Sequence, residues 1–492
     1  MTKHRSDDAV TLQHAAARQF SPRPLVAAVT RALPGAMLLS AGALLSPAAL
    51  AATYPVSNNN DSGSGSLRDA IDQANANPGA DIVTFNSSVT GTINLTTTSL
   101  LITDDVDIQG PGASVLTVNG SGIVTLGATH AGHTHHGKGE RNGGGNATQG
   151  GGYYYGGGTG GVFTIDTSQA PGVAAGTATT QQALASSTVS ISGLTISGGR
   201  ATNGGGIFGY DTDLTVSQCV VSGNTAYDHG GGISIAGKYA SLLVTDSTVT
   251  GNRAYYGGGV ATTQSAITIQ RSTISNNVAF TDGEYGGGGV LVHNDNNNIL
   301  TITDSTITGN HSYYNAGGVF VRHTEAHISN STIANNTADV YGGGLYLHGA
   351  YSGTRVTNST ITGNRATDDG GGISQSANYS YSGLTLSNTV VAGNSTSNGS
   401  NPDVMTNSYG IFTDHSLIQD AGSATIVDNG GNIFNQNPML GALTNNGGPT
   451  LTQLPQAGSP LIDAGDPAFT GPPNNAQRGA GFPRVINGTV DI

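Results

Sequence analysis

The sequence predicts an all-β fold, a parallel β-helix solenoid with a short N-terminal capping helix. A run of glycines followed by one aliphatic residue occurs seven times, at Ile207, Ile233, Val260, Val290, Val319, Leu345 and Ile373. Segments that end in Gly-Asn or Asn-Asn, such as Ser305 to Asn310, recur with the same period as these runs. A period of 26 to 30 residues is typical of a solenoid, in which each unit buries its apolar face against its neighbours.

Each unit has the pattern of β-strands. Between Leu300 and Asn310 apolar and hydroxyl side chains alternate, so Leu300, Ile302 and Ile307 are expected on an inner face. About 27 residues per unit suits a coil of three short strands and three turns. We interpret the Gly and Asn runs as corners rather than phosphate-binding loops, because no Lys-Ser/Thr follows them.

Residues 1–52 are expected to be a secretory signal with an extended basic front. Lys3 and Arg5 precede an Ala/Leu-rich stretch that ends in Ala49-Leu50-Ala51, a small-x-small cleavage pattern. No later segment approaches 18 apolar residues, so we expect no transmembrane segment in the mature chain. The expected location is extracellular, at the cell surface or associated with the outer membrane.

Composition narrows the possible partners. A formal charge of −13 and a pI near 5.2 argue against nucleic acid, whose binding proteins present basic surfaces. The single cysteine, Cys219, excludes an internal disulfide framework and is expected to be a small apolar filler in a strand. We expect a monomer that needs no cofactor.

The solenoid needs caps at its ends. Residues 53–128 are expected to form the N-terminal cap and first coils, with a helix from Ser66 to Asn75 whose start resembles a capping box formed by Ser66 and Asp69. Residues 162–400 contain the β-helix repeats, and residues 401–492, rich in proline and lacking the glycine period, are expected to form C-terminal coils and a cap.

Residues 129–161 interrupt the coils with a His-, Gly- and Tyr-rich insertion. Its four clustered histidines are candidate ligands for Zn²⁺, Ni²⁺ or Cu²⁺: His130, His133, His135 and His136. A polar surface insertion without bound metal explains the same composition.

Motifs near both ends carry a family resemblance. Ser66-Leu-Arg-Asp-Ala-Ile, Gly448-Pro-Thr, Ser459-Pro-Leu-Ile-Asp-Ala-Gly-Asp and Gln477-Arg-Gly resemble the bacterial right-handed parallel β-helix proteins grouped as choice-of-anchor Q domain proteins. The repeats between them resemble the polymorphic outer membrane protein and autotransporter passenger class. This resemblance implies a right-handed, pectin lyase-like β-helix in an exported surface protein, with adhesion as the usual proposed role. The C-terminal translocator barrel of autotransporters has no counterpart in this sequence.

The candidate binding site lies just before each glycine run. Equivalent positions in stacked coils are about 4.8 Å apart, so tyrosines and carboxylates there would form a stripe suited to an extended glycan. The residues concerned are Tyr227, Asp228, Tyr255, Tyr256, Asp282, Glu284, Tyr285, Tyr313, Tyr314, Asp339, Tyr341, Asp368 and Asp369. The alternative is that these side chains only stabilise the turns by stacking.

The function expected from these observations is that of a secreted or surface-exposed β-helix interaction protein, adhesin-like and glycan-binding. Its partner would be an extracellular glycan or a host or cell-surface receptor. The alternative is a polysaccharide lyase or glycoside hydrolase on the same scaffold, using a carboxylate pair such as Asp339 with Asp368. We favour a non-enzymatic role, because the stripe lacks the Gly-His-Gly and Arg-x-Lys motifs of β-helix polygalacturonases. Arg322-His323 beside Glu325 is the one basic and acidic cluster with general acid/base potential.

Overall fold

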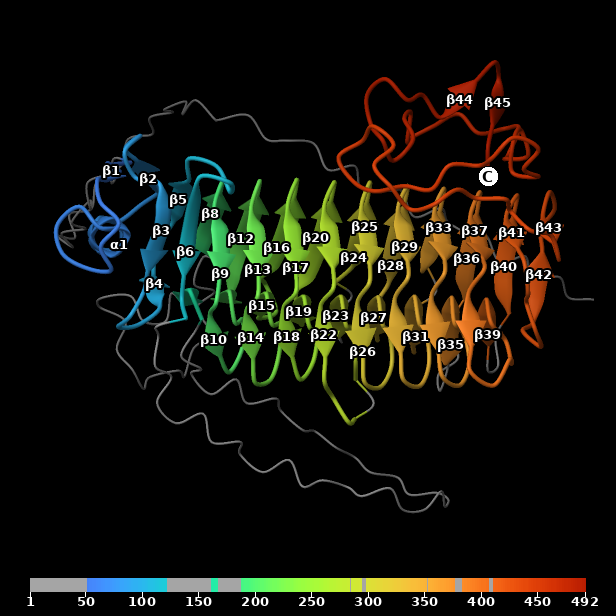
Figure 1. Ribbon diagram of the computed structural model, residues 1–492, viewed down its shortest axis with the longest axis horizontal. Coiled ribbons are helices and arrows are strands. Elements are labelled where there is room, and N and C mark those ends of the chain that lie inside the picture. The colour runs from blue at the N-terminus through green and yellow to red at the C-terminus, as the bar shows by residue number, and fades with distance from the viewer. Residues whose placement is uncertain are drawn as a thin grey trace, which may run out of the picture. The chain divides into compact units, whose positions relative to one another are not determined.

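The computed structural model describes residues 51–121, 161–166, 187–283, 285–293, 298–351, 353–376, 383–406 and 410–492. These residues form a parallel β-solenoid with one short helix, which confirms the predicted fold class. Four parallel sheets run along it, with 13, 12, 10 and 8 strands, and are named sheets A, B, C and D here. Figure 1 shows the strands of successive coils stacked side by side.

One coil illustrates all of them. Strand β11 (Ile207–Tyr210) lies in sheet C, β12 (Thr212–Ser217) in sheet A, β13 (Val220–Ser222) in sheet B and β14 (Thr225–Ala226) in sheet D. The sequence predicted three strands per coil. The fourth exists because the backbone after each Gly-Asn corner stays extended for two residues and pairs with its equivalents in the neighbouring coils.

The two largest sheets begin at the N-terminal cap. Sheet A also contains β1 (Thr53–Val56), β2 (Asp81–Phe85), β5 (Val106–Gln109), β8 (Ser187–Ser192), β16 (Ser241–Thr245), β20 (Ala266–Gln270), β24 (Leu300–Thr303), β28 (Ala326–Ser329), β32 (Arg355–Thr357), β36 (Leu384–Ser387), β40 (Ile411–Asp414) and β42 (Ile426–Asp428). Sheet B also contains β3 (Gly91–Asn94), β6 (Leu116–Asn119), β9 (Thr195–Ser197), β17 (Thr248–Thr250), β21 (Thr273–Ser275), β25 (Thr306–Thr308), β29 (Thr332–Ala334), β33 (Thr360–Thr362), β37 (Val390–Ala392), β41 (Leu417–Ile418) and β43 (Ile433–Phe434).

The other two sheets flank the glycine runs. Sheet C also contains β4 (Leu100–Ile102), β7 (Phe163–Asp166), β15 (Ile233–Ala236), β19 (Val260–Thr263), β23 (Val290–His293), β27 (Val319–Arg322), β31 (Leu345–His348), β35 (Ile373–Ser376) and β39 (Val404–Thr406). Sheet D also contains β10 (Arg200–Ala201), β18 (Arg253–Ala254), β22 (Val278–Ala279), β26 (His311–Ser312), β30 (Thr337–Ala338), β34 (Arg365–Ala366) and β38 (Ser395–Thr396).

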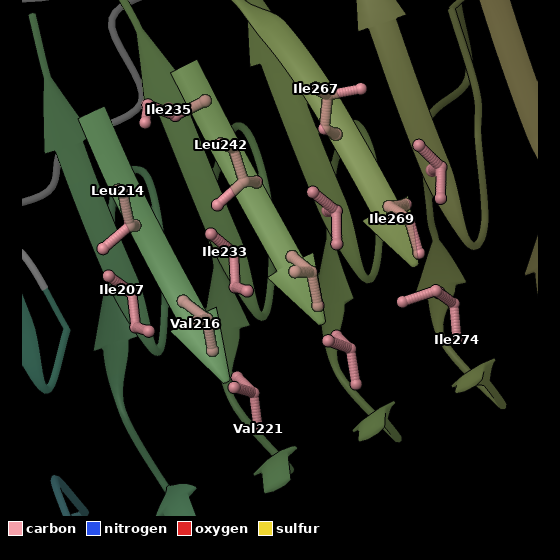
Figure 2. Close-up of a cluster of buried hydrophobic side chains, with 14 of the residues drawn as sticks. Ile207, Leu214, Val216, Val221, Ile233, Ile235, Leu242, Ile267, Ile269 and Ile274 are labelled. Carbon is pink, nitrogen blue, oxygen red and sulfur yellow. The ribbon is translucent and has the colours of Figure 1, made fainter. Parts of the chain in front are cut away.

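The main core fills the interior of the solenoid. Figure 2 shows Ile207, Leu214 and Val221, from sheets C, A and B of one coil, beside their equivalents in the next coils. As the alternation in the sequence predicted, Leu300 and Ile307 are fully buried in this core. The glycines are needed where neighbouring backbones approach, because a Cβ on Gly232 would lie 2.7 Å from the Gly259 carbonyl oxygen.

A ladder of buried asparagines runs along the corner between sheets B and D. The side-chain Nδ2 of each asparagine donates to the Oδ1 of the asparagine in the next coil at 2.9–3.0 Å. The same Nδ2 donates to a backbone carbonyl of the preceding coil at 2.9–3.1 Å. The members are Asn224, Asn252, Asn277, Asn310, Asn336, Asn364 and Asn394.

The residue before each ladder asparagine explains the Gly-Asn and Asn-Asn pairs. Gly251 and Asn276 have φ values of +64° and +55°, a region that glycine and asparagine tolerate best. The chain turns there, so the next asparagine points into the solenoid and reaches both neighbouring coils.

The ladder ends in a carboxylate. Oδ1 of Asp403 accepts hydrogen bonds from the backbone N–H of Asn394 at 3.1 Å and from its Nδ2 at 2.8 Å. Oδ2 accepts from the Asp420 N–H at 2.7 Å. Burial raises the pKa of Asp403 to about 6, although these three hydrogen bonds oppose the shift.

A second ladder lies at the corner between sheets A and B. The backbone N–H of each residue donates to the hydroxyl of the next coil at 3.0–3.2 Å. Ser247, Ser272 and Ser305 are members, and Cys219 occupies the equivalent position in the coil before Ser247. Cys219 therefore lies at a corner rather than in a strand, and burial raises the pKa of its thiol to about 11.

The N-terminal cap is helix α1 (Leu67–Ala76), as predicted. The Ser66 side chain accepts a hydrogen bond from the Asp69 N–H at 3.1 Å, and Asp69 accepts one from the Gly65 N–H at 2.8 Å. Leu67 and Ile71 are buried on the face that joins the main core. In the described part of the chain, no helix has the length and apolarity needed to cross a membrane.

Within residues 401–492, coils continue as far as β43, and residues 435–492 return along the outside of sheet B. This return segment ends in the β-hairpin of β44 (Val485–Ile486) and β45 (Thr489–Val490) and lies beside sheet B in Figure 1. Gln477 Nε2 donates to the Ser305 carbonyl at 3.1 Å and to the Thr450 hydroxyl at 2.9 Å, while its Oε1 accepts from the Thr332 hydroxyl at 2.7 Å. Gln477 therefore joins the return segment to two coils.

Replacing Asn310 with alanine should lower the free energy of unfolding by about 3 kcal/mol or more. The change leaves buried polar groups of Asn277 and Ile274 without their partner, at about 1–3 kcal/mol for each group. Urea denaturation followed by circular dichroism measures the loss. Thr301→Ala on the outer face of sheet A is the control and should change stability by less than about 0.5 kcal/mol. Equal effects of the two variants would contradict a stabilising ladder.

Asp403 should make stability fall as the pH rises from about 4 to about 6. Its ordinary pKa is 3.8 and its folded pKa about 6, so within this window the folded state holds a proton that the unfolded state has lost. The full effect is about 3 kcal/mol. The measurement is the stability difference between Asp403→Asn and the wild type at several pH values. This difference should shift in favour of the variant across the window and stay constant above it, and a pH-independent difference would contradict the assignment.

Gln477→Ala should release the return segment without unfolding the coils. The change removes the hydrogen bonds to Ser305 and Thr332 but no residue of the main core. Limited proteolysis should then cut within residues 435–492 several-fold faster than in the wild type. The exposed Gln456 supplies the control, Gln456→Ala, which should be cut at the wild-type rate.

Candidate functional site

The predicted stripe divides into two surfaces at the turn between sheets D and C. The first, called the outer row here, consists of the residues that directly follow five consecutive two-residue strands of sheet D, from β14 to β30. Its members are Tyr227, Tyr255, Phe280, Tyr313 and Asp339. Because these strands pair in register from coil to coil, equivalent residues are spaced by about 4.8 Å per coil.

The outer row exposes aromatic rings to solvent. Tyr227 and Tyr313 are 41% and 44% exposed, values that few large apolar side chains reach among the residues that the structure describes. Tyr255 lies edge-on to Phe280, with ring centroids 5.7 Å apart. The guanidinium of Arg253 lies over the Phe280 ring at 4.8 Å and near the Tyr313 ring at 6.0 Å. Arg253 thus covers a face of the Phe280 ring, while the Tyr227 and Tyr313 side chains remain exposed.

The Asp339 carboxylate of the outer row and the neighbouring Asp282 carboxylate have hydrogen-bonding partners. The Tyr255 hydroxyl donates to the Asp282 carboxylate, and burial together with this carboxylate raises the pKa of Tyr255. His311 Nε2 lies 2.9 Å from Asp339 Oδ1, and its ring packs edge-on against Tyr313 at 4.8 Å. The row and its neighbouring side chains thus present aromatic rings, carboxylate acceptors and the Arg253 guanidinium donor on one surface.

The second surface is an aromatic cluster against sheet C. Tyr256, Tyr285 and Tyr341 are partly buried and pack against five buried residues: Ala261, Leu291, Ala316, Phe320 and Tyr346. Tyr285 and Phe320 are edge-on with centroids 6.1 Å apart, and Tyr341 stacks with Tyr346 at 6.3 Å. These tyrosines pack within the turn, which is the arrangement expected if they stabilise the turn by stacking.

The remaining stripe residues are not members of either surface. Asp228 Oδ1 is 3.2 Å from His229 Nδ1, and Asp369 accepts a hydrogen bond from Asn401 at 3.0 Å. Tyr314 and Asp368 are half-buried. Glu284 lies outside the described residues.

The Arg322, His323 and Glu325 cluster expected from the sequence divides at the corner after β27. Arg322 lies over the Tyr285 ring at 4.3 Å and contacts His293 at 3.0 Å. Glu325 instead pairs with His327 at 3.2 Å. Burial and the nearby Arg355 lower the pKa of His327, and Glu325 only partly opposes them. Adjacent residues face different sheets here, because the chain turns at His323, whose φ is +50°.

The predicted metal ligands His130, His133, His135 and His136 lie outside the described residues. Within the described ranges, no group of three or more His, Cys, Asp or Glu side chains is arranged to hold a metal ion.

Sequence reasoning missed Phe280 in the outer row and its neighbours Arg253 and His311. Their signal was available, because each follows a ladder asparagine by one residue or by three: Asn252-Arg253, Asn310-His311 and Asn277-Val-Ala-Phe280. Numbering from the ladder asparagine rather than from the glycine run brings Phe280 into register with Tyr227 and Tyr313, and Arg253 into register with His311.

No protein-family model matches the chain, and no curated protein matches it. Among solved structures, the chain is similar to one described as the crystal structure of pectate lyase Pel9A, with a TM-score of 0.40 and 14% sequence identity. The alignment covers 84% of this chain and 92% of that chain. That the chain is a parallel β-helix protein rests on its own strand pairing.

Proposed function

We propose that the protein is an exported, surface-exposed β-helix interaction protein that binds an extended extracellular glycan along the outer row. The observation that carries this proposal is that Tyr227 and Tyr313 are exposed to solvent. Neither ring belongs to the main core. From the coil of Tyr227 to the coil of Asp339 the row spans about 20 Å, which suits several consecutive sugar units.

The chemistry of the row favours a glycan over an apolar partner. Sugar rings present C–H faces that pack on tyrosine, and hydroxyl groups that pair with carboxylates and with Arg253. Arg253 is itself exposed. An apolar protein surface bound here would instead remove water from the Asp339 and His311 pair without replacing its hydrogen bonds, which is unfavourable.

We also propose membership of the choice-of-anchor Q domain class. Its terminal motifs have a structural role that supports the proposal. Thr450 of Gly-Pro-Thr and Gln477 of Gln-Arg-Gly hydrogen-bond to each other and to the coil at Asp304 and Ser305. Leu461 of Ser-Pro-Leu is fully buried against Val390. The motifs thus anchor the return segment on sheet B.

Replacing both Tyr227 and Tyr313 with alanine should weaken retention on a glycan array or on cell-surface polysaccharide. Each ring contributes about 0.5–1.5 kcal/mol if contacts with sugars resemble contacts between rings, so the pair should cost roughly 5- to 100-fold in affinity. Tyr239→Ala, a ring that is 70% exposed elsewhere, is the matched control and should bind as the wild type does. Tyr285→Ala should lower stability rather than retention. Unchanged retention by the double variant would overturn the proposal.

The alternative proposal is a glycan-cleaving enzyme that uses the His311 and Asp339 pair as acid and base beside Tyr313. The same array separates the two proposals. A binding protein releases no reducing ends or unsaturated products, and His311→Asn then leaves that result unchanged. Product release that His311→Asn abolishes without loss of retention would favour the enzyme.

A further inference from the structure

The first strand of the solenoid fixes the position of the residue before it. Strand β1 pairs in parallel with β2, with Thr53 opposite Ile82. The Ala52 carbonyl accepts a hydrogen bond from the Ile82 N–H at 2.8 Å, and the Ala52 N–H donates to Asp81 Oδ1 at 2.8 Å. Ala52 is therefore bound to β2 through both its carbonyl and its nitrogen, whereas Ala51 is exposed.

The carboxylate that accepts from Ala52 is buried without a positively charged partner. Asp81 is 1% exposed. Its Oδ1 also accepts a hydrogen bond from Asn77 Nδ2 at 2.8 Å, but its Oδ2 is buried and has no hydrogen-bond partner among the residues that the structure describes. No Lys, Arg or His of the described ranges forms an ion pair with Asp81. Because a buried carboxylate without a cation is costly, a positive group beside this side chain would stabilise the fold.

The surroundings of Asp81 do not supply that positive group. The neighbouring coil places the acidic Asp105 next to it, with the Asp105 carbonyl accepting from the Asp81 N–H at 3.1 Å. Arg68, the basic residue of helix α1, is paired with Asp61 instead. Desolvation and, after it, the charge of Asp81 raise the pKa of Tyr54 on β1.

We propose that export processing supplies the positive group, through cleavage between Ala51 and Ala52. This bond directly follows the Ala49-Leu50-Ala51 pattern. Hydrolysis by a signal peptidase breaks the C–N bond, and one water molecule adds its hydroxyl to the Ala51 carbonyl carbon and its hydrogen to the Ala52 nitrogen. The new amino group takes up a further proton at neutral pH. The result is an ammonium group at the nitrogen that lies 2.8 Å from Asp81 Oδ1.

The ammonium group completes the contacts of Asp81. Ala52 stays in place because its carbonyl still bonds to Ile82. Its nitrogen gains two protons, so it can donate to Oδ2 as well as to Oδ1 of the same carboxylate. The unpartnered oxygen needs no space for an added ligand, because its new partner is the atom already bound to the other oxygen.

The exported chain is thus joined to β2 by a buried ion pair that the uncleaved chain cannot form. Cleavage here also sets the end of the signal at residue 51 rather than at residue 52. The inference rests on the export that the proposed function includes, and it is independent of glycan binding along the outer row.

Expression of the full chain in a bacterial host, followed by mass spectrometry of the exported protein, tests the position of cleavage. The exported protein should begin at Ala52. Retention of the uncleaved chain would overturn this inference together with the proposed export. An exported protein that begins at another residue would overturn the inference alone.

A double-mutant cycle tests the ion pair. One glycine inserted between Ala51 and Ala52 of the full chain leaves the Ala52 nitrogen as an amide in the exported product and moves the ammonium group one residue away. The insertion should lower the melting temperature by about 3 °C or more, since Asp81 then stays buried without its cation. In the Asp81→Asn background the same insertion should have little effect, because the charge that needs the ammonium group is gone.

The neighbouring Asp104 supplies the matched control, because its carboxylate accepts from the Gly79 N–H rather than from Ala52. Asp104→Asn should leave the effect of the insertion at its full size. Aminopeptidase digestion of the exported protein is the second measurement. Asp81→Asn should speed the release of Ala52 several-fold, whereas Asp104→Asn should not. The inference is overturned if the insertion has the same effect with and without Asp81→Asn, or if Asp81→Asn and Asp104→Asn are digested at the same rate.

Discussion

The fold depends on the requirement that every coil pairs its buried backbone and amide groups with the next coil. These groups are buried, and a buried amide without a partner is costly. The asparagine ladder meets this requirement at the corner between sheets B and D, where the Asn277 side-chain amide donates to the Val249 carbonyl of the preceding coil and to the Asn310 side chain of the next. The serine ladder does the same at the corner between sheets A and B. The apolar core between these corners is consequently held in register.

Features that repeat with the coil were predictable from the sequence. Leu300 and Ile307 were assigned to the core because strands have a period of two, and Ser66 was assigned as a cap because of its spacing from Asp69. The period of the strands did not show which of two neighbouring tyrosines is exposed and which is covered. Tyr255 belongs to the outer row and Tyr256 to the aromatic cluster, since the turn between them follows no simple period and only the stacked neighbours decide which ring is covered.

Contacts between distant parts of the sequence were the least predictable. Gln477 and Ser305 are 172 residues apart, and neither residue belongs to a pattern that links it to the other. The motifs around Gln477 indicated a resemblance to a family, but they did not predict which residues at sheet B they contact. Likewise, nothing in the local sequence of Asp403 distinguishes it from the exposed acidic turns. Its raised pKa follows from its place at the end of a ladder built from other coils.

The asparagine ladder has a direction, because each rung donates its side-chain amide to the rung of the following coil. Any rung between Asn224 and Asn394 therefore presents the same donors on one side and the same acceptor on the other. A coil duplicated or deleted in the gene would leave both neighbours matched, so the length of the solenoid can change during evolution in whole coils. Coils cannot be added in the same way at the two ends of the ladder. Gly199 supplies only a donor at the first rung and Asp403 only an acceptor at the last, so new coils have to enter between them.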